Sequence, residues 1–153
     1  MQNIYYCEGF FGWPGEAIQG VVPESNNFCD DSAASDFDGI TWDLDGNGTA
    51  DALTDGLLLL RHTFGITGSS LTTDAISSNS PLSNEEVVTK VEGVYQIADI
   101  DNNGSVDALT DGLIVLRYLF GLTGNFLTED VVANNGTRTD AVDIEAYLQS
   151  KMP

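Results

Sequence analysis

Apolar residues recur at helical spacing in two segments of the chain that are nearly copies of each other. Residues three and four positions apart share one face of a helix. The pattern predicts helices over residues 56–64 and 112–120, each followed by a glycine that ends it, Gly65 and Gly121. The shared apolar face consists of Leu57, Leu60 and Phe64 in the first segment and of Leu113, Leu116 and Phe120 in the second.

Both predicted helices are also apolar outside that face. Leu58 and Leu59 point elsewhere in the first helix. The corresponding residues of the second helix are Ile114, Val115 and Leu119. A helix that is apolar nearly all round is buried on several sides. Two explanations stay open: the two helices pack against each other, or they offer a surface to a partner.

A further helix is predicted later in each segment. The first begins at Ser83-Asn-Glu-Glu86, which has the pattern of a capping box. Its apolar positions are Val87, Val88, Val91 and Val94. The second covers residues 139–148 and places Val142, Ala146 and Leu148 near one face.

These segments belong to an internal duplication with a period of 56 residues. Starting from Asp43 and Asp99, 17 of 26 aligned positions are identical. We therefore predict a mainly α fold in which two loop–helix repeats, residues 41–98 and 99–153, pack together. Residues 1–40 lie outside the duplication and are rich in aromatic residues and glycine. We expect them to form an extended or β-like arm.

An acidic loop precedes each of the two apolar helices. Alternating Asp and Asn residues around a glycine at the sixth position direct oxygen atoms toward a hard divalent cation. We predict two bound Ca²⁺ ions, because Mg²⁺ gives up its waters reluctantly and demands a rigid octahedron. The alternative is an acidic turn that caps a helix. The predicted ligands are Asp43, Asp45, Asn47, the Thr49 carbonyl, Asp51 and Asp55 in the first loop, and Asp99, Asp101, Asn103, the Ser105 carbonyl, Asp107 and Asp111 in the second.

The chain carries 24 acidic residues against 5 Lys and Arg, for a net charge of −19. Such a charge argues against nucleic acid and anionic membranes as partners, and no apolar run is long enough to span a bilayer. Cys7 and Cys29 are predicted to form a disulfide, and two unpaired thiols are the alternative. Calcium loops combined with a disulfide favour an extracellular or cell-surface location.

The sequence Asp-x-Asp-x-Asn-Gly-x-x-Asp leading into Leu-Leu-x-x-Arg resembles the dockerin family of duplicated, EF-hand-like units in extracellular bacterial proteins. The resemblance implies calcium-dependent folding and protein–protein binding. The chain departs from the family in three ways. The closing carboxylate falls one place late, after Thr54 and Thr110, and the period is more than twice that of a compact dockerin. Ala-Leu pairs, Ala52-Leu53 and Ala108-Leu109, replace the small polar recognition pair.

No nucleophile elbow, phosphate-binding glycine loop or zinc-binding Cys/His spacing is present, so we expect no enzyme activity. His62, the one histidine, is expected to pack or to make a surface contact. We expect a secreted, calcium-stabilised assembly module that binds other protein chains, including copies of itself in a filament. The alternatives are a docking module that binds a cohesin-like receptor, and a carbohydrate-binding module using Trp13, Trp42 and the tyrosines. Of three N-glycosylation sequons, only the one at Asn135 could carry a glycan without blocking a predicted calcium ligand, and we favour its chance occurrence.

Overall fold

The computed structural model describes residues 39–153, and Gly39–Pro153 forms one compact unit. The predicted arm, apart from its last two residues, lies outside the described residues. The predicted disulfide between Cys7 and Cys29 lies outside them as well.

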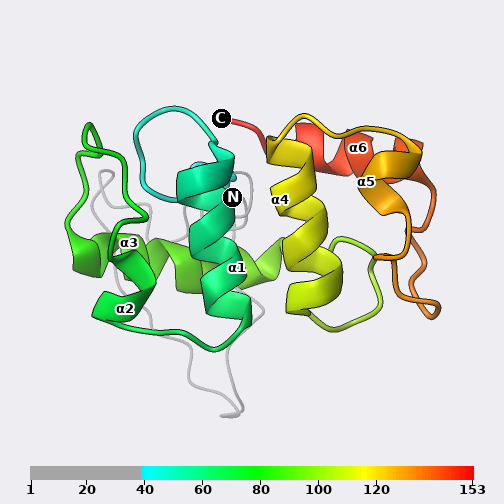
Figure 1. Ribbon diagram of the computed structural model, residues 1–153, viewed down its shortest axis with the longest axis horizontal. Helices are drawn as coiled ribbons and strands as arrows, with labels where there is room; N and C mark the ends of the chain where they lie inside the picture. Colours follow the sequence, from blue (N-terminus) through cyan, green and yellow to red (C-terminus); the bar gives the residue numbers. More distant parts are fainter. Residues whose placement is uncertain (1–38) are drawn as a thin grey trace, which may run out of the picture. The chain divides into compact units, whose positions relative to one another are not determined.

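Each repeat contributes three α-helices, which are labelled in Figure 1, and one π-helical turn. No strand occurs within residues 39–153, so the prediction of a mainly α fold with two packed loop–helix units is confirmed. None of the helices in this range is long and apolar enough to cross a membrane. The first repeat contains η2 (Ala52–Gly56), α1 (Leu57–Thr63), α2 (Ser69–Thr72), α3 (Asn84–Gly93) and the 3₁₀ turn η3 (Val94–Gln96). The second contains η4 (Ala108–Gly112), α4 (Leu113–Leu119), α5 (Asn125–Thr128) and α6 (Ala141–Gln149).

The helices α1 and α4 lie side by side and antiparallel at the junction of the repeats (Figure 1). Gly56, just before α1, faces Leu116 in the middle of α4 and Leu119 at its end, where a Cβ atom on the glycine would lie 2.9 Å from Leu116 Cδ1 and 3.4 Å from Leu119 Cδ1. Gly112, just before α4, faces Leu60 in the middle of α1 and Thr63 at its end, where an added Cβ atom would lie 3.2 Å from Leu60 Cδ1 and 3.0 Å from Thr63 Oγ1. The absence of a side chain on each glycine lets the two helices approach closely. Of the two explanations for the apolar helices, packing between the repeats therefore holds.

The core is built from residues next to the predicted shared apolar face rather than from that face itself. Leu58 and Leu59 of α1 are fully buried, as are Ile114 and Val115 of α4 to within 1%. Four residues of the predicted shared apolar face are only partly buried: Leu57, Leu60, Leu113 and Leu116. Phe64 and Phe120 follow the last helical residue of α1 and α4 and are 58% and 57% exposed.

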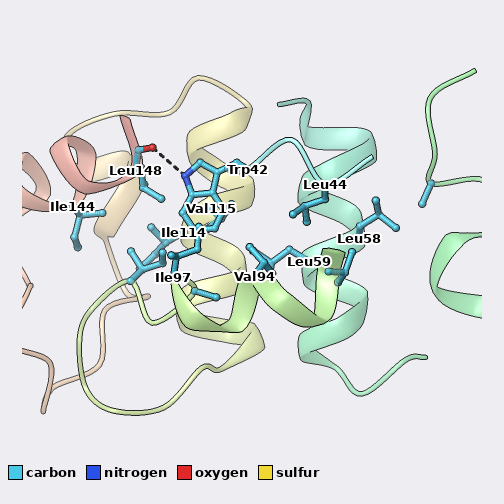
Figure 2. Packing of buried hydrophobic residues seen from close by; sticks show 14 of the residues in the cluster. Trp42, Leu44, Leu58, Leu59, Val94, Ile97, Ile114, Val115, Ile144 and Leu148 are labelled. Atoms are coloured by element: carbon cyan, nitrogen blue, oxygen red, sulfur yellow. Dashed lines mark hydrogen bonds between the residues drawn. The ribbon is translucent and has the colours of Figure 1, made fainter. Parts of the chain in front are cut away.

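Trp42 joins the beginning of the first repeat to the end of the second (Figure 2). Its indole Nε1 donates a hydrogen bond to the Leu148 carbonyl of α6 at 3.0 Å, and its backbone amide donates to the Lys151 carbonyl at 2.9 Å. The side chain is 1% exposed. A buried indole with a satisfied N–H is a packing residue, so Trp42 has no free face to stack on a sugar ring.

The third helix of each repeat closes the core. The predicted capping box at Ser83 is confirmed: its hydroxyl accepts from the Glu86 amide, and the Glu86 carboxylate accepts from the Ser83 amide. The predicted face of the last helix is wrong in part. Val142 is 73% exposed and Ala146 is exposed, whereas Ile144 and Leu148, four residues apart, are fully buried. Asp140 caps this helix, which begins at Ala141, two residues after the start of the predicted segment.

Candidate metal centres

Each acidic loop is folded around the carboxylate of its first aspartate. Asp43 accepts hydrogen bonds from the amides of Asn47 and Gly48 at 3.0 and 2.9 Å. In the second loop, Asp99 accepts from the equivalent amides at the same two distances. The sharp bend that these contacts require passes through Gly48, at φ 93°. Only glycine adopts this conformation without strain.

Three carboxylates converge in each loop. In the first repeat they belong to Asp43, Asp45 and Asp55, and one oxygen from each lies within 4.8 Å of the others. The second repeat brings together Asp99, Asp101 and Asp111 in the same way. All six side chains are buried except that of Asp99, which is partly exposed. Two buried triads of oxygen donors, each followed by a helix, resemble paired loop–helix calcium-binding units.

A π-helical turn brings the closing carboxylate into each triad. The Gly56 amide donates to the Asp51 carbonyl five residues earlier at 3.0 Å, and the Gly112 amide donates to the Asp107 carbonyl at 3.1 Å. A π turn holds one residue more than an α turn. The displaced Asp55 therefore still reaches the loop, although it stands one position later than in the dockerin pattern. Sequence reasoning detected the displacement and missed the turn that compensates for it.

The closing aspartate also holds the loop backbone in place. Asp55 Oδ1 accepts from the amides of Leu44 and Asp45 at 2.6 and 3.0 Å, and its Oδ2 accepts from the Asp51 amide at 2.7 Å. In the second repeat, Asp111 makes the equivalent contacts. The Thr54 and Thr110 hydroxyls also donate to Oδ2 of these carboxylates, at 3.1 and 3.0 Å. Each oxygen therefore accepts two hydrogen bonds, which orient the group, and a bound cation would take the place of at least one of them.

Some of the predicted ligands lie outside the triads. Asp51 and Asp107 stand at the residue before each π turn, where the backbone is extended and the side chain is exposed. Thr49 is exposed, and its hydroxyl donates to Asn47 Oδ1 and Asp51 Oδ2 at 2.7 and 2.9 Å. In the second loop, the Ser105 amide donates to Asn103 Oδ1 at 2.8 Å, as the Thr49 amide does to Asn47.

The triads are electrostatically unfavourable without a cation. Burial raises the pKa of Asp55, and the neighbouring charge of Asp45 adds to the effect. Burial likewise raises the pKa of Asp101, with further contributions from the charges of Asp111 and Asp99. Crowded carboxylates in a site shielded from water favour protonation or the binding of a positive ion.

The second triad contains a buried oxygen with no partner. Asp101 is fully buried, its Oδ2 accepts from the Ala133 amide at 2.8 Å, and its Oδ1 has no hydrogen-bond donor. An uncompensated buried oxygen costs free energy. A hard cation, which prefers carboxylate and carbonyl oxygen as ligands, would satisfy it. The residues present therefore fit a hard metal ion such as Ca²⁺.

Two further contacts were missed by sequence reasoning because they join residues far apart in the chain. Asp45 Oδ2 accepts from the Ser77 amide at 2.8 Å, and this pairing repeats in Asp101 and Ala133. Arg61 donates through Nη1 to the carbonyls of Leu71 and Thr73 at 3.0 and 2.7 Å, which fastens α2 to α1. Arg117 makes the corresponding contacts with the carbonyl of Leu127 in α5 and that of Glu129 just after it.

His62 packs as predicted. Its ring meets that of Tyr95 edge-on, with the centroids 4.9 Å apart.

No protein family, no curated protein and no solved structure matches this chain. The likeness to calcium-binding loop–helix units therefore rests on the two triads and on the helices that follow them.

Proposed function

We propose that the chain is a calcium-binding module in which each repeat holds one Ca²⁺ ion and the ions stabilise the fold. The observation that carries this proposal is the buried, unpartnered Oδ1 of Asp101 inside a group of three carboxylates. Loop backbone carbonyls and the side chains of Asn47 and Asn103 complete the proposed coordination. This would give the six to eight oxygen ligands that Ca²⁺ takes.

The proposed role of the ions is structural. The triad carboxylates already hold the loop amides, so the same groups would connect each ion to the backbone around it. Such an ion joins the loop to the start of α1 or α4, and its binding free energy becomes part of the folding free energy.

Calorimetric titration of the dialysed chain tests the proposal. We expect two Ca²⁺ ions per chain, and weaker binding of Mg²⁺ because the loops do not enforce its octahedron. Binding of no ion, or equal binding of both metals at one site, would contradict the assignment.

We further propose that the module binds protein, and that a second copy of this chain is the partner. Three pairs of exposed apolar side chains support this, because the members of each pair occupy equivalent positions in the two repeats and have nearly equal exposure. They are Leu53 and Leu109 at 70% and 68%, Phe64 and Phe120 at 58% and 57%, and Ile66 and Leu122 at 37% and 38%.

The antiparallel packing of α1 and α4 places these residues at the two ends of the helix pair. Leu53, before α1, lies at the same end as Phe120 and Leu122, after α4; Leu109 lies at the other end with Phe64 and Ile66. A chain with two equivalent apolar ends can bind a neighbour at each and so extend an assembly. In this proposal the module is extracellular, where calcium is abundant.

Light scattering after size exclusion in calcium tests self-association. We expect species larger than the 16.4 kDa chain and their loss in the double variant Phe64→Ser/Phe120→Ser. The control is Val142→Ser, a change at an exposed valine of α6. A wild-type chain that stays monomeric at all concentrations contradicts self-assembly. In that case, recovery of a cohesin-like receptor from native secretions would favour the dockerin-type alternative.

A further inference from the structure

Each metal loop is crossed by a segment from later in its own repeat. We name residues 77–82 the first strap and residues 133–138 the second strap. Both follow the short helix α2 or α5 and both return to the middle aspartate of the loop. The amide at the start of each strap donates to that aspartate at 2.8 Å, from Ser77 to Asp45 and from Ala133 to Asp101.

The first strap is attached at two more points. The Ser80 hydroxyl donates to the Asp45 carbonyl at 2.5 Å and accepts from the Leu82 amide at 3.2 Å. The Leu82 side chain lies directly over Gly46, where a Cβ atom would come within 2.8 Å of Leu82 Cδ1. Gly46 has φ 74°, a conformation that favours glycine, and the close contact with Leu82 leaves no room for a side chain.

The second strap is attached through different side chains to the same place. The Arg138 amide donates to the Asp101 carbonyl at 2.9 Å, and its guanidinium donates to the Ile100 carbonyl at 2.6 Å. Thr137 and Asn102 are joined side chain to side chain, and the Thr137 hydroxyl also donates to the Asn102 carbonyl at 3.2 Å. The strap–loop contact is therefore kept in both repeats although the residues that make it differ.

We propose that ion binding and strap docking are coupled in each repeat through the middle aspartate, so that calcium fastens the strap of its own repeat to the loop. The proposal rests on the proposed calcium site. Asp45 and Asp101 each hold the strap amide with Oδ2 and take part in the triad with the same carboxylate. Without the ion, the repulsion between three buried carboxylates drives the middle one out of position, and the strap loses its acceptor.

Coupling of this kind is reciprocal. If the ion strengthens the attachment of the strap, then the attached strap strengthens the binding of the ion by the same factor. Ser80 and Thr137 are therefore positioning residues for the two sites, although neither belongs to a triad. Both side chains are uncharged, so replacing them changes the attachment of the strap and leaves the charge of the site as it was.

Calcium titration of Ser80→Ala and Thr137→Ala tests the proposal in the full chain. We expect Ser80→Ala to weaken the first site by roughly three- to tenfold, the value of about one hydrogen bond, and to leave the second unchanged. Thr137→Ala should have the opposite selectivity. The matched controls are Ser78→Ala and Thr139→Ala, whose side chains are exposed and make no hydrogen bond in the described part of the chain.

Amide hydrogen exchange supplies a readout independent of affinity. We expect the Ser77 and Ala133 amides to be protected in calcium and to exchange faster in chelator. In calcium, Ser80→Ala should speed exchange at Ser77 but not at Ala133. Two bound ions with unchanged affinity and unchanged strap exchange in both variants would overturn the coupling and leave the calcium sites intact. Failure to bind calcium at all would overturn the proposed function itself.

Discussion

Gly56 packs against Leu116 of the other repeat so closely that a Cβ atom added to the glycine would lie only 2.9 Å from Leu116 Cδ1. The same glycine follows Asp55, the closing carboxylate of the first triad, and its amide completes the π turn. One position therefore links the loop, the π turn and the junction between the repeats. Gly112 has the same three relationships in the second repeat.

Replacing Gly56 by alanine should lower the free energy of unfolding by about 1–3 kcal/mol, because the added methyl group forces Leu116 out of its position. The measurement is urea denaturation in saturating calcium. Gly93→Ala is the matched control, since Gly93 lies at the end of α3 with no atom within 4 Å of an added Cβ. Alanine is the better helix former, so the control should be neutral or more stable by up to about 1 kcal/mol. Equal effects of the two changes would show that Gly56 is not a site of close packing.

The closing carboxylates should matter more for metal binding than the aspartates that precede the π turns. Asp55→Asn removes a triad charge and an acceptor of the Asp51 amide, so we expect the calcium count to fall from two to one. Asp51→Asn changes an exposed side chain outside the triad and should keep both ions, with a smaller loss of affinity. Calorimetry measures both. The reverse order would mean that the ion does not use the carboxylate carried by the π turn.

The metal-free chain should become more stable on mild acidification. The pKa values of Asp55 and Asp101 are raised in the folded state. Their contribution to stability is therefore fully present below the unfolded-state pKa of about 3.9 and is lost as pH rises through the folded-state pKa. Calcium-loaded protein should show the opposite trend, because protons compete with the ion for the carboxylates.

Denaturation of chelator-dialysed protein between pH 7 and pH 5 measures this trend. Asp55→Asn should flatten the pH dependence of the metal-free chain, since it removes one of the two carboxyl groups whose pKa is raised. A metal-free stability that falls steadily over this range, in both proteins, would mean that the triads are not a source of repulsion.

The features that local sequence encodes were predictable. The loop aspartates recur at fixed spacing, the glycines Gly65 and Gly121 follow the helices, and Ser83 and Glu86 form a capping box by their positions alone. Each of these depends on neighbours within a few residues, which is why a repeated pattern was enough to find them.

Other features depend on tertiary packing. Val142 and Ile144 have similar side chains, and only the docking of α6 decides that Ile144 is buried and Val142 exposed. The contact of Ser77 with Asp45 spans 32 residues, and it uses a backbone amide that any residue would supply. The π turn at Gly56 cannot be inferred from the sequence alone, because it follows from the position of Asp55 in the triad.

Thermal unfolding in calcium and in chelator tests the central claim most directly, because ions that stabilise the fold must shift its midpoint. At a calcium concentration of 100 times Kd, each site adds about 2.7 kcal/mol, so two sites should raise Tm by at least about 10 °C. Magnesium at the same concentration should give a smaller shift. An unchanged Tm in chelator, with calcium present in excess in the parallel sample, would contradict the assignment of the two triads as calcium sites.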